Sequence, residues 1–278
     1  MDATHITGAP RPQMTGRYIM IMKTLATASI LALMLAGCAP KAEVVAAPAP
    51  AAEPTPAPDA DVAAPNTLTA EEAAAGWRLL FNGTDFTGWK IYKGGPVAAP
   101  WSVADGAIAL AAGTGTDIIT DEAFGPFELS LEWKISPNGN SGIIYLVNEA
   151  ESATNTYNTG PEMQVLDDAG HADGKIPSHQ AGALYDFAPP LVAAARPVGE
   201  WNQATVRFTG TSIEHWLNGQ KVAETSYGDD AWKAKVAASK FKQWPLFGTF
   251  AKGHIALQDH GDPVWYRSIK IRPLTTTP

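Results

Sequence analysis

The chain has 278 residues, of which 45% are hydrophobic and 17% charged, and its formal net charge is −8 at pH 7. This composition excludes general disorder, which needs low hydrophobicity and high charge, and a coiled coil, which needs sustained charged heptads. From residue 76 onward, 16 Lys and Arg against 21 Asp and Glu leave a net charge of −5. Without a basic stripe, nucleic acid is not expected as a partner.

Residues 1–37 are predicted to be a leader containing a lipoprotein signal peptide. A lysine precedes the apolar run Leu25–Leu35, and small residues follow before Cys38, as in a secretory signal. The run is shorter than the roughly 20 residues that span a bilayer, which makes a transmembrane anchor the weaker interpretation. Met20 or Met22 is expected to be the initiator rather than the first residue.

The four residues Leu35-Ala36-Gly37-Cys38 resemble the lipobox of bacterial lipoproteins, in which the cysteine is acylated. The alternative is an incidental cysteine at the end of an ordinary signal. The resemblance implies that Cys38 is lipidated, and Ala39 after it favours the outer membrane, facing the periplasm. Residues 38–75 hold this cysteine and an Ala/Pro-rich stretch that is predicted to be a tether.

Residues 76–275 are predicted to be the folded domain, just after a short helix that opens where Thr69 precedes two glutamates. Period-two alternation or short apolar runs between turn residues predict its strands. The predicted strands are Trp77–Phe81, Trp89–Tyr92, Ala107–Leu110, Phe127–Ile135, Gly142–Val147, Glu162–Leu166, Ala183–Phe187, Ala204–Phe208, Ile213–Leu217, Val222–Thr225, Ile255–Gln258 and Val264–Ile271.

Two local signals refine this prediction. Asn218-Gly219 between two strand-like runs indicates a hairpin with a type I′ turn. One further helix is predicted from Asp229 to about Lys240. Many short strands with so little helix predict an all-β fold of two antiparallel sheets packed as a sandwich.

Several strings in a fixed order resemble the bacterial 3-keto-disaccharide hydrolase family, also described as 3-keto-glucoside-1,2-lyase/3-keto-2-hydroxy-glucal hydratase. They include Leu79-Leu80-Phe81-Asn82-Gly83, Asn140-Ser141-Gly142, Glu162-Met163-Gln164, Gly182-Ala183-Leu184-Tyr185, His215-Trp216-Leu217-Asn218-Gly219 and Gln258-Asp259-His260-Gly261. The resemblance extends from Gly76 to Leu274. It implies a concanavalin A-like jelly roll whose concave face holds sugars.

Two polar residues share one face of a predicted strand. Glu162 and Gln164 alternate with Met163 and Val165, whose apolar side chains indicate the inward face. The polar pair is either an ordinary solvated strand face or part of a sugar site. The family resemblance and the nearby Asp167 favour the sugar site.

A histidine follows the strand predicted at Ile255–Gln258. His260 shares a face with Gln258, has a carboxylate beside it in Asp259 and precedes a glycine that gives backbone access. A histidine in this setting can act as a general base.

Four further residues have alternative interpretations. His179 lies in a loop ahead of Tyr185, and both could contact a sugar. Arg267 shares a strand face with apolar residues, where a charge needs a partner; a structural salt bridge and a clamp on a sugar oxygen are both compatible. His215 lies between apolar neighbours and fits a core histidine as well as a site residue.

Glu128 and Glu132 resemble the paired carboxylates of jelly-roll glucanases, but Ser130 stands where those enzymes have a middle Asp. Their Cα atoms would be about 13 Å apart on a strand, whereas glycosidase carboxyl groups are roughly 5 to 9.5 Å apart. We therefore interpret the pair as a solvated outer face, which disfavours a conventional endoglucanase.

The resemblance implies cleavage of 3-keto-glycosides by base-assisted elimination and hydration, or by net hydrolysis. His260, oriented by Asp259, is expected to be the base and Glu162 the acid or a metal ligand. Gln164, Asp167, His179, Tyr185, Gln258 and Arg267 are expected to bind substrate. A divalent metal is possible, and a sugar 3-oxidoreductase could supply the substrate. The alternative is a carbohydrate-binding module without catalysis.

Overall fold

The computed structural model describes residues 64–275. The predictions of a leader and signal peptide, of lipidation at Cys38 and of a tether as far as residue 63 fall outside the described residues. Within residues 64–275, no helix is both long and apolar enough to cross a bilayer.

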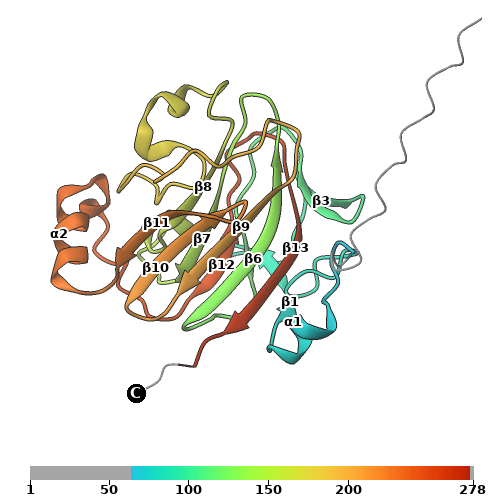
Figure 1. The fold of residues 1–278 in the computed structure, drawn as a ribbon, viewed down its shortest axis with the longest axis horizontal. Coiled ribbons are helices and arrows are strands. Elements are labelled where there is room, and N and C mark those ends of the chain that lie inside the picture. The colour runs from blue at the N-terminus through green and yellow to red at the C-terminus, as the bar shows by residue number, and fades with distance from the viewer. Residues whose placement is uncertain (1–63, 276–278) are drawn as a thin grey trace, which may run out of the picture. The chain divides into compact units, whose positions relative to one another are not determined.

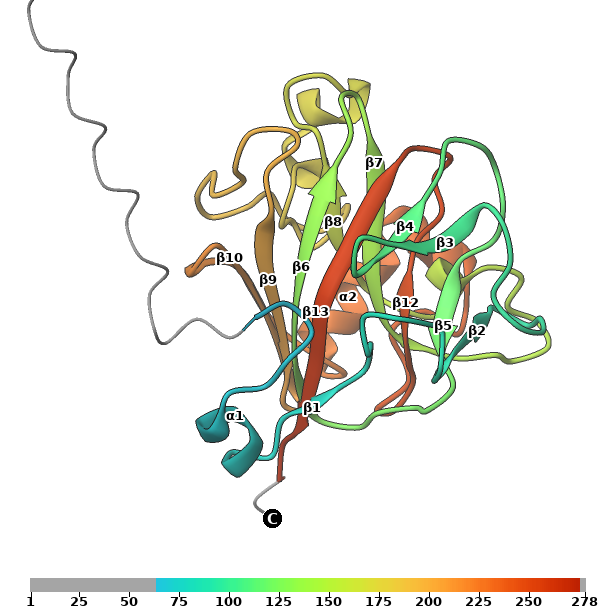
Figure 2. The same cartoon turned by 90° about the vertical axis from the view of Figure 1, so that its right-hand side faces the viewer.

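The strands of residues 64–275 form two antiparallel sheets that pack against each other (Figures 1 and 2). The larger sheet has the order β11-β10-β9-β6-β13-β4-β3, and β1 pairs with β13. Its strands are β1 (Arg78–Leu79), β3 (Trp101–Ala104), β4 (Ala107–Leu110), β6 (Phe127–Ile135), β9 (Asn202–Phe208), β10 (Ser212–Leu217), β11 (Gln220–Ser226) and β13 (Val264–Pro273).

The smaller sheet has five strands in the order β2-β5-β12-β7-β8. They are β2 (Trp89–Ile91), β5 (Ile118–Thr120), β7 (Asn140–Val147), β8 (Glu162–Leu166) and β12 (His254–Leu257). All its pairings are antiparallel, so the predicted all-β sandwich of two antiparallel sheets is confirmed.

Helices are short and lie outside the sheets. Among the described residues there are two α-helices, α1 (Ala70–Ala74) and α2 (Asp230–Ala238), and four 3₁₀ turns, η1 (Thr156–Asn158), η2 (Ala172–Lys175), η3 (Pro177–His179) and η4 (Lys240–Gln243). Both α-helices begin where the sequence predicts them. Thr69 and Glu72 form a reciprocal capping box on α1, and Asp229 accepts the backbone N–H of Trp232 at the start of α2.

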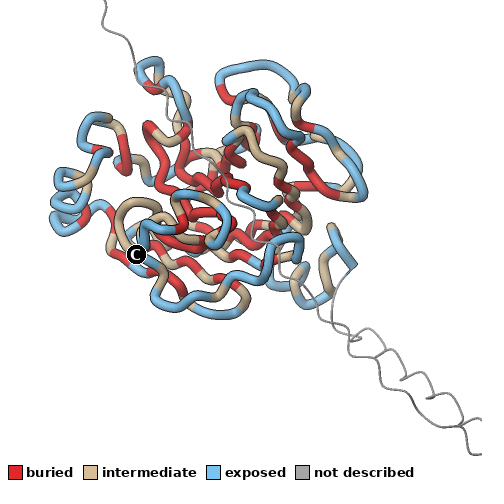
Figure 3. The backbone as a smooth tube through the Cα atoms, turned by 90° about the horizontal axis from the view of Figure 1, so that it is seen from above, coloured by how far each residue is buried: buried red, intermediate tan, exposed pale blue. Residues whose placement is uncertain are grey.

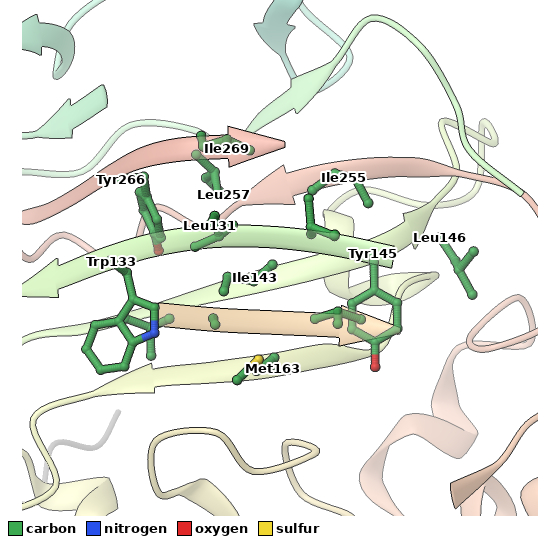
Figure 4. Packing of buried hydrophobic residues seen from close by; sticks show 14 of the residues in the cluster. Leu131, Trp133, Ile143, Tyr145, Leu146, Met163, Ile255, Leu257, Tyr266 and Ile269 are labelled. Atoms are coloured by element: carbon green, nitrogen blue, oxygen red, sulfur yellow. The ribbon is translucent and has the colours of Figure 1, made fainter. Parts of the chain in front are cut away.

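Alternation along the strands builds the core between the sheets. The odd-numbered residues of β6 from Phe127 to Ile135 are buried, as are Met163 and Val165 of β8. Figure 3 shows buried residues concentrated in the interior, and Figure 4 shows Trp133 and Tyr145 among the side chains packed there. Each large apolar side chain that is fully buried contributes about 1.5–3 kcal/mol, so this layer holds the sandwich together.

A buried polar pair links the two sheets. His215 of β10 is fully buried, and its Nδ1 lies 3.2 Å from the carbonyl oxygen of Gly182. Nδ1 therefore donates, and Nε2 accepts the Tyr145 hydroxyl at 2.8 Å. Burial lowers the pKa of His215 to about 4, which keeps the ring neutral. Of the two interpretations of His215, the structure supports the core histidine.

The described residues just before Gly76 pack on the sandwich. The Asn66 side chain donates to the Gly106 carbonyl at 2.7 Å and accepts the Ser268 N–H at 2.8 Å. Glu72 forms an ion pair with Lys270 of β13. Residues from Asn66 onward therefore contact the sandwich.

The strand prediction was wrong at Ala183–Phe187. Of this segment only Leu184 forms isolated bridges, one of them to Met163. Gly182 and Asp186 on either side adopt positive φ angles of 85° and 65°, which interrupt an extended ladder. The short strands β3 and β5 were not predicted.

Candidate functional site

A row of polar side chains crosses the outer face of the smaller sheet. Gly142 of β7 is in register with Gln164 of β8, and on its other side its carbonyl accepts the Gln258 N–H at 3.0 Å. Glu162 lies two residues before Gln164 on the same face of β8, in register with Ile144 of β7. The predicted polar face of this strand thus forms the floor of a cavity of about 310 Å³.

Glu162 extends over a glycine. A Cβ atom on Gly142 would lie 2.1 Å from the Glu162 Oε1 atom, so any side chain there would displace the carboxyl group. Because Gly142 has no side chain, the Glu162 carboxyl group can lie directly over it.

Burial raises the pKa of the Glu162 carboxyl group. Only 7% of the residue is exposed, and this burial, together with the nearby charge of Asp117, raises its pKa to about 8 against the partial opposition of Lys240. At neutral pH the group is therefore mostly protonated and able to donate a proton.

Amide groups lie next to this carboxyl group. Gln164 Nε2 donates to Asn140 Oδ1 at 3.2 Å, and within residues 64–275 the buried Gln164 Oε1 has no hydrogen-bond partner. Gln258 lines the same cavity. A buried amide oxygen without a partner is costly unless something else donates to it, and a sugar hydroxyl has the chemistry to do so.

Aromatic rings and a lysine form the opposite wall of the cavity. Tyr157 of η1 and Trp244 after η4 are packed edge to face, with ring centroids 5.3 Å apart. The Lys240 ammonium lies 4.1 Å from the centre of the Tyr185 ring. The cavity therefore combines aromatic rings, a lysine and several hydrogen-bonding groups.

Tyr185 lines the cavity, whereas His179 lies behind it. The two rings are 4.4 Å apart, and His179 Nε2 is 3.1 Å from an oxygen of Asp186. Burial, and then the charge of Glu162, raise the pKa of the Tyr185 hydroxyl well above its ordinary value. The prediction that His179 contacts the sugar is corrected: it supports Tyr185 from outside the cavity.

His260 stands exposed at the rim, with its ring edge to face with His171 at a centroid distance of 6.2 Å. The Asp259 carboxylate is directed elsewhere. It accepts the Gly261 N–H at 2.9 Å, while the Asp259 N–H donates to Asp117. Among residues 64–275 the carboxylate thus closes its own turn rather than bonding to the His260 ring, and the expectation that Asp259 orients His260 stays a prediction.

Asp167 and Arg267 lie away from the cavity. Asp167 accepts the backbone N–H groups of Asn138, Ala169 and Gly170, so it organises a loop. Arg267 lies on the outer face of the larger sheet, paired with Glu132 at 2.9 Å. Both expected sugar contacts are corrected, and Arg267 takes the salt-bridge alternative.

Glu128 and Glu132 also lie on that outer face. Each pairs with an arginine of β13, Arg272 at 2.7 Å and Arg267 at 2.9 Å. Both carboxylates are partly exposed and on the opposite sheet from the cavity, in agreement with the interpretation of a solvated outer face.

Within the described residues, no three His, Cys, Asp or Glu side chains are grouped so as to hold a metal ion. The cavity offers Glu162 and His260 with neutral amides instead. The possible divalent metal thus lacks a ligand set in residues 64–275.

The sequence did not single out five of the residues that line the cavity. They are Asn140, Tyr157, Lys240, Phe241 and Trp244. Asn140 belongs to a string that carries the family resemblance and could have been found there. The others come from 3₁₀ turns and loops without a periodic signal, and only the fold brings them to the sheet.

Comparisons with known proteins agree with this architecture. Residues 76–272 match the family model of the 3-keto-alpha-glucoside-1,2-lyase-like domain. A 3-keto-disaccharide hydrolase of Bacteroides thetaiotaomicron is 36% identical, over 72% of this chain and 79% of that protein.

Two solved structures from Parabacteroides distasonis, both assigned as glycosyl hydrolases, share the fold. The first is 37% identical, has a TM-score of 0.72 and covers 76% of this chain and 100% of its own. The second is 26% identical and has a TM-score of 0.55. The match covers 71% of this chain and 99% of that structure's chain.

Proposed function

Because the chain belongs to the 3-keto-alpha-glucoside-1,2-lyase-like family, we propose that its cavity cleaves glycosides whose glucose ring carries a ketone at C3. The observation that carries this proposal is the buried Glu162 carboxyl group, with its pKa raised to about 8, beside a histidine at the rim. Such a pair supplies an acid and a base to one cavity.

The chemistry begins at the ring carbon next to the ketone. A C3 ketone acidifies the C2 proton, so a base can remove it and leave an enolate. Collapse of the enolate forms the C1–C2 double bond and breaks the bond from C1 to the leaving oxygen, which takes a proton from an acid. Water can then add its oxygen to C1 and a proton to C2, which gives the 3-keto sugar and completes a net hydrolysis.

His260 is the proposed base, because its ring is exposed at the rim and accessible to a bound sugar. Glu162 is the proposed acid, because it keeps its proton at neutral pH and can give it to the leaving oxygen. A positioned acid or base contributes about 10²–10⁴ in rate. Lys240 brings a positive charge to the cavity, which favours an enolate oxygen.

The remaining wall residues would bind and orient the sugar. The amides of Asn140, Gln164 and Gln258 can hold ring hydroxyls. The aromatic rings of Tyr157 and Trp244 offer apolar surface against which a sugar ring can pack.

A matched pair of substrates would test this proposal: a 3-keto-glucoside and the same glucoside without the ketone. The purified protein should release the leaving group only from the 3-keto compound, with or without EDTA. Binding of both compounds without cleavage would indicate a carbohydrate-binding module. Cleavage of the unoxidised glucoside would indicate a conventional glycosidase.

The cellular setting stays a prediction from the sequence. We propose that Cys38 is acylated and attaches the protein to the outer membrane facing the periplasm, on the support of Leu35-Ala36-Gly37-Cys38. The substrate requires a preceding oxidation at C3, so an enzyme of the sugar 3-oxidoreductase class must act first. Labelling with a radioactive fatty acid should mark the protein and not its Cys38→Ser variant.

A further inference from the structure

Asp117 lies just before β5, the strand between β2 and β12 in the smaller sheet (Figure 2). Its main-chain carbonyl accepts the Tyr92 N–H at 2.9 Å, which fixes its backbone to the segment after β2. Within residues 64–275, Asp117 is not among those that line the cavity holding Glu162; it lines a neighbouring cavity of about 450 Å³ instead. Asp117 therefore acts on a sugar over Glu162 through its neighbours rather than by contact.

Both oxygens of the Asp117 carboxyl group accept hydrogen bonds from the protein. Oδ1 accepts the Asp259 N–H at 2.8 Å, and Oδ2 accepts the hydroxyl of Thr156. Burial raises the pKa of this carboxyl group to about 6, against the opposing effect of the two hydrogen bonds. At neutral pH the group is therefore mostly ionised, and hydrogen bonds to an ionised acceptor are stronger than those between neutral groups.

The two donors belong to segments that carry residues of the cavity. Asp259 immediately precedes His260, which stands at the rim of the cavity. Thr156, which is fully buried, immediately precedes Tyr157, whose ring lines the same cavity. One carboxyl group therefore ties the turn after β12 to the 3₁₀ turn η1, and each of these turns presents one side chain to the cavity.

We propose that Asp117 is a positioning residue of the cavity, because its carboxylate fixes the turn that carries His260 relative to the turn that carries Tyr157. The inference rests on the proposed function. A general base must lie within hydrogen-bond reach of the proton that it removes, and a displacement of about 1 Å can cost about 10²-fold in rate. Removal of the Asp117 carboxylate releases both turns at once.

Three substitutions separate the parts of this role. Asp117→Ala removes both acceptors and should lower kcat/KM on a 3-keto-glycoside by about 10²-fold. Asp117→Asn keeps an oxygen that can accept the Asp259 N–H and should recover most of this loss. Thr156→Val removes only the hydroxyl beside Tyr157 and should fall between wild type and Asp117→Ala. Assays at pH 7, between the pKa of Asp117 at about 6 and that of Glu162 at about 8, keep the first mostly ionised and the second mostly protonated.

A double-mutant cycle with His260 distinguishes positioning from a general loss of stability. Asp117→Ala should cost at most about tenfold in a His260→Ala background, because one of the two groups that it positions is already absent. A purely structural role would lower kcat/KM by the same factor in both backgrounds. Should Asp117→Ala fail to fold in urea-unfolding measurements, the cycle of Thr156→Val with Tyr157→Ala applies the same criterion.

Thr67→Val is the matched control for Thr156→Val, because the exposed Thr67 donates its hydroxyl to the Ala64 carbonyl, away from the cavity. It should keep the wild-type kcat/KM. Wild-type activity in folded Asp117→Ala protein, or equal losses in both backgrounds, would overturn the positioning role alone. Absence of cleavage by the wild-type protein would instead overturn the proposed function and this inference with it, so the two failures are distinguishable.

Discussion

Replacing Glu162 by Gln should change how the stability of the protein depends on pH. The amide has nearly the same shape as the carboxyl group but does not ionise. In the native wild-type protein the carboxyl group has a pKa of about 8, against an ordinary value of 4.5. Its folded pKa is raised, so its contribution to stability is present below pH 4.5 and is lost as the pH rises toward 8.

The size of this effect follows from the two pKa values. Between 4.5 and about 8 lies a span of about 3.5 pH units, and each unit corresponds to about 1.4 kcal/mol. The wild-type protein should therefore lose up to about 5 kcal/mol relative to Glu162→Gln across this range. Below pH 4.5 and above pH 8 the difference between the two proteins should be constant.

Urea unfolding at a series of pH values from 4 to 9 measures this difference directly, and groups common to both proteins cancel. The same variant should lose about 10²–10⁴ in kcat/KM on a 3-keto-glycoside, because the amide cannot supply the proton. Glu128→Gln, a surface carboxylate paired with Arg272, is the matched control and should keep full activity. Stability curves of the two proteins that stay parallel from pH 4.5 to 8 would refute the assignment of a buried, protonated Glu162.

Three further changes separate the cavity from the rest of the fold. Gly142→Ala should displace Glu162 and reduce kcat/KM by about 10² or more, whereas Gly95→Ala, with no atom within 4 Å of the new Cβ, should behave as wild type in the same assay. Arg267→Ala should leave kcat/KM unchanged and lower the unfolding free energy by about 1 kcal/mol. A large loss of activity would show instead that Arg267 contributes to the functional site. His215→Phe should cost about 1–3 kcal/mol and remove the loss of stability that wild type shows as the pH falls from 6.5 to about 4, as measured by thermal unfolding.

Sequence patterns predicted the parts of the fold that depend on neighbouring residues. The alternation of β6 appears in the structure as one buried face. Asn218 and Gly219 adopt positive φ angles of 48° and 79°, as the Asn-Gly hairpin signal requires. The same reasoning placed Glu162 and Gln164 on one outward face, where they form the floor of the cavity.

Arg267 shows where alternation fails. Counting by twos places it on the face of Ile269 and Ile271, which are buried. A break in the register between Arg267 and Lys270, with Ser268 at a φ of 53°, turns the strand over, so Arg267 faces outward. Such a bulge depends on contacts distant in sequence, here the Asn66 side chain bonded to Ser268.

The aromatic residues and the lysine of the cavity could not be predicted from the sequence either. Lys240 and Trp244 lie about eighty residues after Glu162 and reach the cavity only because α2 and η4 pack beside the smaller sheet. Conversely, Asp259 and His260 are adjacent in sequence, yet the Asp259 Oδ1 atom accepts the Gly261 N–H. Neighbours in the chain are not necessarily partners in a site.

Cleavage of a 3-keto-disaccharide in D₂O tests the central claim most directly. Removal of the C2 proton by the enzyme predicts deuterium at C2 of the released 3-keto-glucose, or a released product with a C1–C2 double bond. NMR spectra of the product, compared with substrate incubated without protein, would show either outcome. Cleavage with the original hydrogen retained at C2 would contradict the account.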